Sequence, residues 1–420
     1  SPALAGDLNL NGLTVIIGAG ASWDLGANDV EVENFENQGT ILIQPPGQID
    51  SGNQPNDADS GTFRFYGADG ALYRDTNDDS ANDHLFPNLE LIGSGRTYRL
   101  VADGQDYTID VNGDLLIDGA LLDADDGDGA DSADDDPLAL AGNMILSGGG
   151  GFRSRSAAHT VGGDVSGSGT VTVDSGSITV TGDFTPSVVN FTAAGSLSVA
   201  GDWNPGSFDL TAGLVELTAG GSVGAGSFNN LSIIAGTRTA AGDIEVKGNL
   251  VIDGVLEMGS YELSVTGSVT GTGTLTSGSG DVDVDGAQLA VSNFSDSGGS
   301  TSVARQWNVA GSYSPGTSTV IFDGTAGTPS TLAVTAEFFN VTIPAGSVLR
   351  IDGQNLFIEN LLSNNGALLR NAGTIVSAQD TDSGLTRYIT GGDLQAYSGT
   401  DYHDLEIDAG ATVSLPADLQ

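Results

Sequence analysis

Short motifs recur along this 420-residue chain, and they constrain its fold more than any other feature. The first motif, Phe228-Asn-Asn-Leu231-Ser-Ile233-Ile-Ala-Gly236, returns at residues 338–346 and 402–410, with a looser copy at 86–91. The second motif, V-x-G-x-L-x-I-x-G-x-L, occurs at residues 111–121 and 246–256. A repeat made of short strands cannot bury its apolar side chains alone, so its copies are expected to stack on one another.

A third motif, G-D-W-N-P-G at residues 201–206, is echoed at 311–316 and 182–186. The offset from Trp203 to Tyr313 equals the offset from Phe228 to Phe338, which indicates tandem copies at 201–310 and 311–420. We therefore divide the chain into N-terminal coils at 1–70, coils with Asp-rich insertions at 71–142, and a repetitive solenoid at 143–420.

The local pattern is that of β-strands. Alternating runs such as Val171-Thr-Val173 and Ile178-Thr-Val180 are bounded by Gly, Asn, Asp or Ser, which favour tight turns. Most of the abundant residue types are poor helix formers. The sequence predicts an all-β parallel β-solenoid, right-handed like most parallel β-helices, with coils of roughly 20 residues. A string of β-sandwich domains is the competing interpretation, but sandwiches rarely repeat a glycine pattern at so short a spacing.

Charge and composition exclude several classes of protein. The chain has 55 acidic and 12 basic residues, a net charge of −43 and no cysteine. A nucleic-acid partner needs a basic surface, and membrane insertion as a helix needs about 20 consecutive apolar residues, so neither is expected. Only 16% of the residues are charged and 39% are hydrophobic, which argues against disorder.

The order of the three motifs resembles the repeats of large secreted bacterial and archaeal surface proteins, of the filamentous-haemagglutinin-like adhesin type. The resemblance covers most of residues 86–420 and is architectural. It implies a secreted protein with an extracellular or cell-surface role, structural or adhesive. It carries no catalytic residues.

The two ends of the sequence hold complementary halves of the pattern. Residues 4–12 match the second motif with no first motif before them, and residues 402–410 match the first with no second after them. Either copies assemble head to tail into an open filament, or these residues are a segment of a longer repetitive chain. Neither end has the expected polar cap. The predicted subunit contacts are Leu4, Leu8, Leu10, Tyr402, Leu405, Ile407, Val413, Leu415 and Leu419.

Two Asp-rich segments are candidate calcium sites, because calcium prefers six to eight oxygen ligands on loops with sharp glycine turns. The stronger segment resembles thrombospondin-type-3 and related D-x-D-G calcium loops, from which it departs in spacing. A solvated acidic loop is the alternative. The predicted ligands of structural Ca²⁺ are Asp123, Asp125, Asp126, Asp128, Asp131 and Asp134, with Asp75, Asn77 and Asp79 in the weaker segment.

Catalysis finds little support, and we expect no enzyme. His84, His159 and His403 are isolated, lack zinc-type spacing, and are expected at the surface. Parallel β-helix polysaccharide lyases are the relevant enzyme analogue, but the charge of −43 would repel an acidic polymer. Arg153 and Arg155, near a glycine-rich stretch, are expected to make loop contacts.

Two minor features remain. Trp203 and Tyr313 are expected to pack at coil corners, with an exposed sugar-binding stack as the alternative. Asn190, Asn230, Asn293 and Asn340 lie in N-x-S/T sequons and are glycosylation acceptors if the host has the machinery.

The sequence thus predicts a non-enzymatic extracellular structural protein, a subunit or segment of a filament, sheath or surface layer. Its predicted partners are copies of itself joined head to tail. An adhesin stalk that binds glycans or surfaces is the alternative, and a polysaccharide lyase is less well supported.

Overall fold

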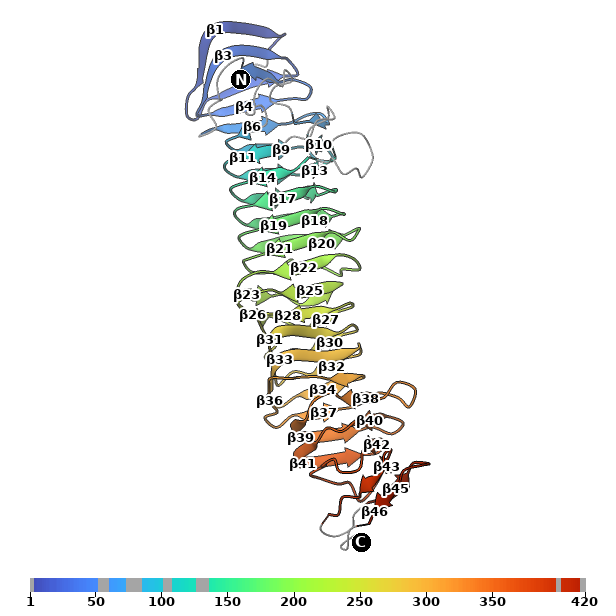
Figure 1. Cartoon of the computed structure of the whole chain (residues 1–420). Helices are drawn as coiled ribbons and strands as arrows, with labels where there is room; N and C mark the ends of the chain where they lie inside the picture. The colour runs from blue at the N-terminus through green and yellow to red at the C-terminus, as the bar shows by residue number, and fades with distance from the viewer. Residues whose placement is uncertain are drawn as a thin grey trace. The chain divides into compact units, whose positions relative to one another are not determined.

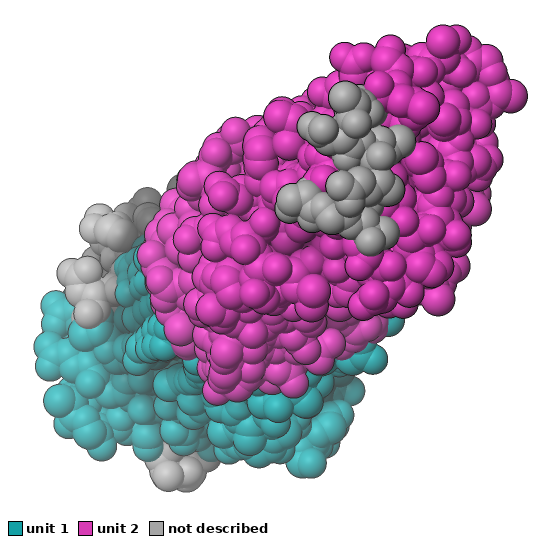
Figure 2. All heavy atoms as spheres, turned by 90° about the horizontal axis from the view of Figure 1, so that it is seen from below, with its two compact units in different colours: residues 1–217 teal, residues 218–420 magenta. Residues whose placement is uncertain are grey.

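The computed structural model describes residues 4–51, 60–72, 85–100, 108–125, 136–397 and 402–415. The chain divides into two compact units, residues 1–217 and 218–420, coloured teal and magenta in Figure 2. The described residues form β-strands and no helix. Accordingly, no described segment is a helix of the length and hydropathy needed to span a membrane.

The first unit contains the following strands: β1 (Leu8–Ile17), β2 (Ser22–Gly26), β3 (Val30–Asn37), β4 (Thr40–Ile43), β5 (Ile49–Ser51), β6 (Thr62–Phe65), β7 (Gly70–Ala71), β8 (Leu85–Phe86), β9 (Leu89–Ile92), β10 (Thr97–Arg99), β11 (Ile109–Val111), β12 (Leu115–Asp118), β13 (Leu121–Asp123), β14 (Leu138–Leu140), β15 (Met144–Ser147), β16 (Gly151–Arg153), β17 (Ala158–Val161), β18 (Val165–Val173), β19 (Ser177–Val180), β20 (Phe184–Phe191), β21 (Ser196–Val199) and β22 (Leu214–Leu217).

The second unit contains the following strands: β23 (Gly221–Val223), β24 (Gly226–Phe228), β25 (Asn230–Ile233), β26 (Thr237–Ala240), β27 (Ile244–Val246), β28 (Leu250–Ile252), β29 (Val255–Glu257), β30 (Leu263–Val265), β31 (Val269–Gly278), β32 (Val282–Val284), β33 (Gln288–Asp296), β34 (Ser300–Val303), β35 (Gln306–Trp307), β36 (Ser312–Ser314), β37 (Thr319–Ile321), β38 (Ser330–Leu332), β39 (Ala336–Ile343), β40 (Val348–Arg350), β41 (Leu356–Asn364), β42 (Ala367–Arg370), β43 (Leu385–Tyr388), β44 (Gly392–Asp393), β45 (Asp404–Ile407) and β46 (Val413–Ser414).

Each unit is a parallel β-solenoid, in which strands of successive coils stack on one another (Figure 1). In the first unit, β9, β12, β15 and β18 form one such row, and β14, β17, β19 and β21 form another, with every pair parallel. The two units together contain about 19 coils. The all-β solenoid is therefore confirmed, and the parallel pairing rules out antiparallel sandwiches.

The length of a coil follows from the register of the strand pairs. Leu231 lies opposite Leu250 in the next coil, and this offset agrees with the coil length predicted from the sequence. Leu115 lies opposite Met144, a wider offset, and this longer coil contains the Asp-rich residues 126–135. The extra length is what an insertion between two stacked strands requires.

The core consists of apolar rows that run along the stack. Leu89, Leu115, Met144, Val165 and Phe184 occupy one register position in five successive coils, and each is at most 1% exposed. Alternate residues of each strand point inward, so one strand contributes two or three such side chains. Full burial of one side chain of this kind contributes roughly 1.5–3 kcal/mol.

A ladder of Asn and Asp side chains runs beside this core row. The Oδ1 of Asn88 accepts a hydrogen bond from the backbone N–H of Asp114 in the next coil, at 3.0 Å. The same bond repeats from Asp114 to Asn143, and then to Asp164, Asp183 and Asp202, at 2.8–2.9 Å. The carboxylates of the chain are therefore partly structural, because they bind a backbone N–H at the turn where the strand begins.

Trp203 and Tyr313, which were expected at coil corners, stack on aromatic side chains of the preceding coil. The rings of Phe184 and Trp203 stack with centroids 5.0 Å apart, and those of Phe294 and Tyr313 stack at 5.4 Å. Trp203 is 0% exposed, so the alternative of an exposed sugar-binding stack is wrong for this residue.

Candidate functional sites

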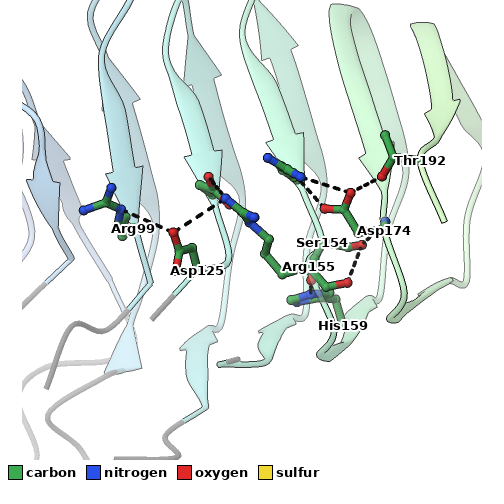
Figure 3. Close-up of polar contacts among 9 residues, drawn as sticks. Arg99, Asp125, Ser154, Arg155, His159, Asp174 and Thr192 are labelled. Carbon is green, nitrogen blue, oxygen red and sulfur yellow. Dashed lines mark hydrogen bonds and ion pairs between the residues drawn. The ribbon is translucent and has the colours of Figure 1, made fainter. Parts of the chain in front are cut away.

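An ionic ladder lies at one corner of the first unit, next to the coil that contains residues 126–135 (Figure 3). The last residues of β10, β13 and β16 are Arg99, Asp123 and Arg153, which are neighbours in register. Opposite charges therefore alternate from coil to coil. Cross-strand pairs of this kind stabilise a sheet by roughly 0.2–1 kcal/mol each.

Arg155 is the centre of this ladder. Its Nε and Nη2 donate to the two carboxylate oxygens of Asp123 at 2.6 and 2.8 Å, and its Nη2 lies 3.5 Å from Asp125. The hydrogen bond to Asp123 raises the pKa of Arg155 above its ordinary value. Arg155 adopts a φ of 52°, a left-handed conformation that is uncommon for residues other than glycine. Arg99 reaches Asp125 from the other side, at 3.8 Å.

Asp174 continues the ladder in the following coil. Arg153 donates to its two oxygens at 2.7 and 3.2 Å, and the hydroxyl of Thr192 donates to Oδ1. Burial alone would raise the pKa of Asp174, but the hydrogen bonds from Arg153 and Thr192 outweigh it and lower that pKa below its ordinary value. The predicted loop contacts of Arg153 and Arg155 are thus ion pairs.

His159 lies behind the ladder in the interior, and the expectation of a surface histidine is wrong. Its exposed fraction is 1%, and burial lowers its pKa to about 4. The backbone N–H of Leu138 donates to Nδ1 at 3.0 Å, and Nε2 donates to the carbonyl of Ser154 at 2.6 Å. Because both ring nitrogens are engaged, the neutral imidazole is a structural bridge between coils. It has no free nitrogen for a metal or a substrate proton.

The predicted calcium ligands fall into two groups. Asp123 and Asp125 are buried and paired with arginines, so their oxygens fit calcium poorly. The others lie outside the described residues: Asp126, Asp128, Asp131, Asp134, Asp75, Asn77 and Asp79. Among the residues that the structure describes, no group of three or more His, Cys, Asp or Glu side chains is arranged to hold a metal ion.

At the N-terminal end, three predicted contact residues lie in or near the first coil. Leu8 and Leu10 of β1 lie opposite Val30 and Val32 of β3, both fully buried, which identifies the two leucines as interior positions. Leu4, Leu8 and Leu10 are nevertheless partly exposed. Among the described residues, β3 is the strand that pairs with β1, so the other edge of β1 is open.

At the C-terminal end, Leu405 and Ile407 of β45 also occupy interior register positions. Leu405 follows Leu349, Leu368 and Thr386 in register and is 38% exposed, and Ile407, which follows buried Tyr388, is 40% exposed. Val413 is partly exposed, Leu415 is 68% exposed, and Leu419 lies outside the described residues. Among the described residues, β43 is the strand that pairs with β45, so no described coil covers these side chains.

A polar network partly fills the interior of the coils that precede β45. Buried Arg370 donates to the Oε1 of Gln395 at 2.7 Å and lies over the ring of Tyr388, 5.1 Å from its centroid. The hydroxyl of Tyr402 donates to the carbonyl of Gln395 at 2.5 Å and lies 2.8 Å from the hydroxyl of Tyr388. Tyr402 is therefore anchored within its own chain.

The four sequon asparagines differ in accessibility. Asn190 is exposed on β20, where a glycan would have room. Asn230, Asn293 and Asn340 are only partly exposed, and their amide groups bond to neighbouring coils. Their partners are Asn249 for Asn230, Ser312 for Asn293, and Thr319 and Asn360 for Asn340.

Comparisons with protein-family models, with curated proteins and with solved structures find no significant match for this chain.

Proposed function

We propose that this chain is a non-enzymatic extracellular structural protein, a subunit or segment of a filament, sheath or surface layer. Its coils continue from one copy to the next, head to tail. The observation that carries the proposal is the exposure of interior leucines at both ends of the described chain, Leu8 and Leu10 in β1 and Leu405 in β45. An uncovered apolar strand with an open edge is a template for pairing with another chain.

The chemistry of the interior supports a non-enzymatic role. Four ionisable groups of the first unit are paired with one another, Arg155 with Asp123 and Arg153 with Asp174. The buried histidine is held neutral between two backbone groups. Groups locked in this way hold coils together and are not available as an acid or base for a substrate.

An extracellular location, in salt-rich or calcium-rich water, agrees with the composition. A charge of −43 on a chain with a single lysine keeps a surface polymer soluble by repulsion, which dissolved ions screen. We include structural Ca²⁺ in the proposal, bound by the Asp-rich residues 126–134 rather than by Asp123.

A second candidate is an adhesin stalk that binds glycans or surfaces. It is favoured by a row of polar residues along the outer face of the second unit. The row runs through Thr239, Glu257, Thr276, Ser295 and Ser314, which are neighbours in register. Regularly spaced hydroxyls suit a polysaccharide, and a glycan array tests this candidate directly.

The experiment for the leading proposal is mass photometry and negative-stain electron microscopy of the native protein across a range of salt and calcium concentrations. We expect open-ended filaments, and the subunit form of the proposal requires that their denatured chains have the 42.3 kDa mass of this sequence. Strictly monomeric particles under all conditions would contradict assembly. A native chain mass far above this value would contradict the subunit form of the proposal.

A further inference from the structure

The structure contains a template for the contact between copies, because the first and second motifs pair directly with each other. This happens once in each unit: β9 pairs with β12, and β25 pairs with β28. The register is the same in both cases, with Leu89 opposite Leu115 and Leu231 opposite Leu250. The residue two positions later in each strand pairs in the same way, Leu91 with Ile117 and Ile233 with Ile252.

The aromatic residue that opens the first motif is also in register. Phe86 of β8 lies opposite Val111, and Phe228 of β24 lies opposite Val246, the residue that opens the second motif. We call the pairing of a first motif with a second motif an internal junction. Each internal junction is therefore held in register by three apolar pairs. A shift of the strand by one residue would turn every one of these side chains to the other face.

A hydrogen bond and a glycine complete the template. Asn230, just before Leu231, accepts the backbone N–H of Asn249 at 2.9 Å, as Asn88 accepts that of Asp114. The residue before that donor is glycine in both coils. A Cβ on Gly248 would lie 2.4 Å from the Oδ1 of Asn230, and one on Gly113 would lie 2.1 Å from the Oδ1 of Asn88. Glycine is thus required here by the side chain of the preceding coil.

The N-terminal coil has a glycine at the same position, Gly6, but no described side chain of a preceding coil packs against it. Gly6-Asp7-Leu8 repeats Gly113-Asp-Leu115, and Asp7 already acts as a ladder residue, since its Oδ1 accepts the N–H of Asp29 at 3.0 Å. A Cβ on Gly6, however, would meet nothing within 4 Å. Gly6 is therefore the residue type that is required wherever an Asn or Asp side chain of a preceding coil packs at this position.

Asp404 is an Asp at the motif position whose side chain packs against the glycine in the two internal pairings. In the motif Tyr402-His-Asp404-Leu405-Glu-Ile407, it corresponds to Asn230 and Asn88. It is exposed at the start of β45, whose interior leucine is uncovered. The two ends of one chain therefore supply both halves of the internal junction, with each position filled.

Resting on the proposed function, we propose that a second copy of this chain covers β45 with its own β1, in the register of the internal junctions. Leu405 of one copy lies opposite Leu8 of the next, Ile407 opposite Leu10, and Tyr402 opposite Leu4. Asp404 accepts the backbone N–H of Asp7, and Gly6 leaves room for the Asp404 carboxylate. The contact extends the parallel row by one more pair, with strands about 4.8 Å apart.

Paired cysteines test the register, because the chain has no cysteine of its own. The register places the outward residue Asn9 opposite Glu406, so N9C/E406C brings two Cα atoms to about 5 Å, within reach of a disulfide. The matched control N11C/E406C uses the next outward residue, about 8 Å away and out of reach. Under mild oxidation we expect the first variant to form covalent ladders of chains on non-reducing gels, and the second to remain monomeric on them.

Gly6→Ala tests the glycine, with Gly18→Ala as the control, because a Cβ meets nothing within 4 Å at either position in the isolated chain. We expect both variants to unfold at the wild-type urea concentration. Gly6→Ala alone should raise the critical concentration for assembly by at least about tenfold, equivalent to about 1.4 kcal/mol. Wild-type assembly of a folded Gly6→Ala variant would overturn the proposed junction.

The outcomes separate this junction from the proposed function. Filaments whose N9C/E406C chains do not link, or link no better than N11C/E406C, would overturn the register and leave head-to-tail assembly standing. Absence of any assembly in the wild-type protein would overturn both. Further coils of the same polypeptide preceding Gly6 in the native protein would overturn the choice of a second copy as the occupant.

Discussion

Arg155 lies across the carboxylate of Asp123, with its Nε and Nη2 2.6 and 2.8 Å from the two oxygens. The two residues lie far apart in the sequence and belong to neighbouring coils. The same guanidinium reaches Asp125, so one cation compensates two carboxylates whose side chains are 9% and 7% exposed. The ion pairs therefore join the coils on either side of residues 126–135.

We predict that Arg155→Met destabilises the first unit by about 3 kcal/mol, because it leaves two buried carboxylates without their main counter-charge. Arg350→Met is the control, since Arg350 and Asp352 form a pair with both side chains about half exposed. An exposed pair of this kind contributes at most about 1 kcal/mol. Urea unfolding followed by circular dichroism measures both changes. Equal losses for the two variants would contradict the structural role of Arg155.

A glycine at a coil corner should be intolerant of a side chain where the preceding coil passes close to it. A Cβ on Gly286 would lie 1.9 Å from the carbonyl oxygen of Gly267, whereas one on Gly327 would meet nothing within 4 Å. We predict that Gly286→Ala costs about 3 kcal/mol of stability and that Gly327→Ala costs less than about 0.5 kcal/mol. Similar unfolding midpoints for the two variants would contradict the close stacking of the coils.

The stability of the first unit should depend on pH through His159. Burial lowers the pKa of this residue to about 4, below the ordinary value of 6.5. Between these values the unfolded chain binds a proton that the folded chain does not, so acidification favours unfolding. The stabilisation is complete above pH 6.5, and about 3 kcal/mol is lost as the pH falls to 4.

His159→Gln should therefore flatten the dependence of the urea midpoint on pH between 7 and 4.5. His403→Gln is the matched control, the same substitution at a histidine that is exposed near the C-terminal end. Identical slopes for wild type and His159→Gln would show that His159 is not buried in its neutral form.

We predict that calcium binding depends on the Asp-rich residues 126–134 and not on Asp123. Calorimetric titration of a D126N/D128N/D131N variant should show an affinity at least about tenfold weaker than wild type. Asp123→Asn should change it little, because Arg155 already occupies both oxygens of Asp123. Chelation should leave the β-sheet circular dichroism unchanged. Unaltered binding by the triple variant would reject this site.

The coil length and the inward side chains were predictable from the sequence, because apolar residues such as Leu231 and Ile233 alternate within motifs that recur. Their pairing partners were less evident. That Leu231 lies opposite Leu250, so that the first motif pairs with the second, follows from the three-dimensional stack. The dipeptides Gly-Asp and Gly-Asn recur in the sequence, and this recurrence was the signal from which the ladder of Asn and Asp side chains could have been predicted.

His159 and the arginine ladder escaped sequence reasoning for a physical reason. The inward position of a polar residue cannot be recognised until the coils are aligned. His159 occupies the register of Ile178 and Leu197, which are both buried. Alignment of the coils would have placed it inside. The pairing of Arg155 with Asp123 is harder to predict, because the insertion between them changes the coil length and breaks the spacing.

Electron cryomicroscopy of the native assembly, at a resolution that traces side chains, tests the central claim most directly. We predict an open filament in which coil stacking continues through every junction at about 4.8 Å, with Leu8 of one copy opposite Leu405 of its neighbour. Particles that remain single chains with uncovered ends, at high protein concentration and in salt and calcium, would contradict it.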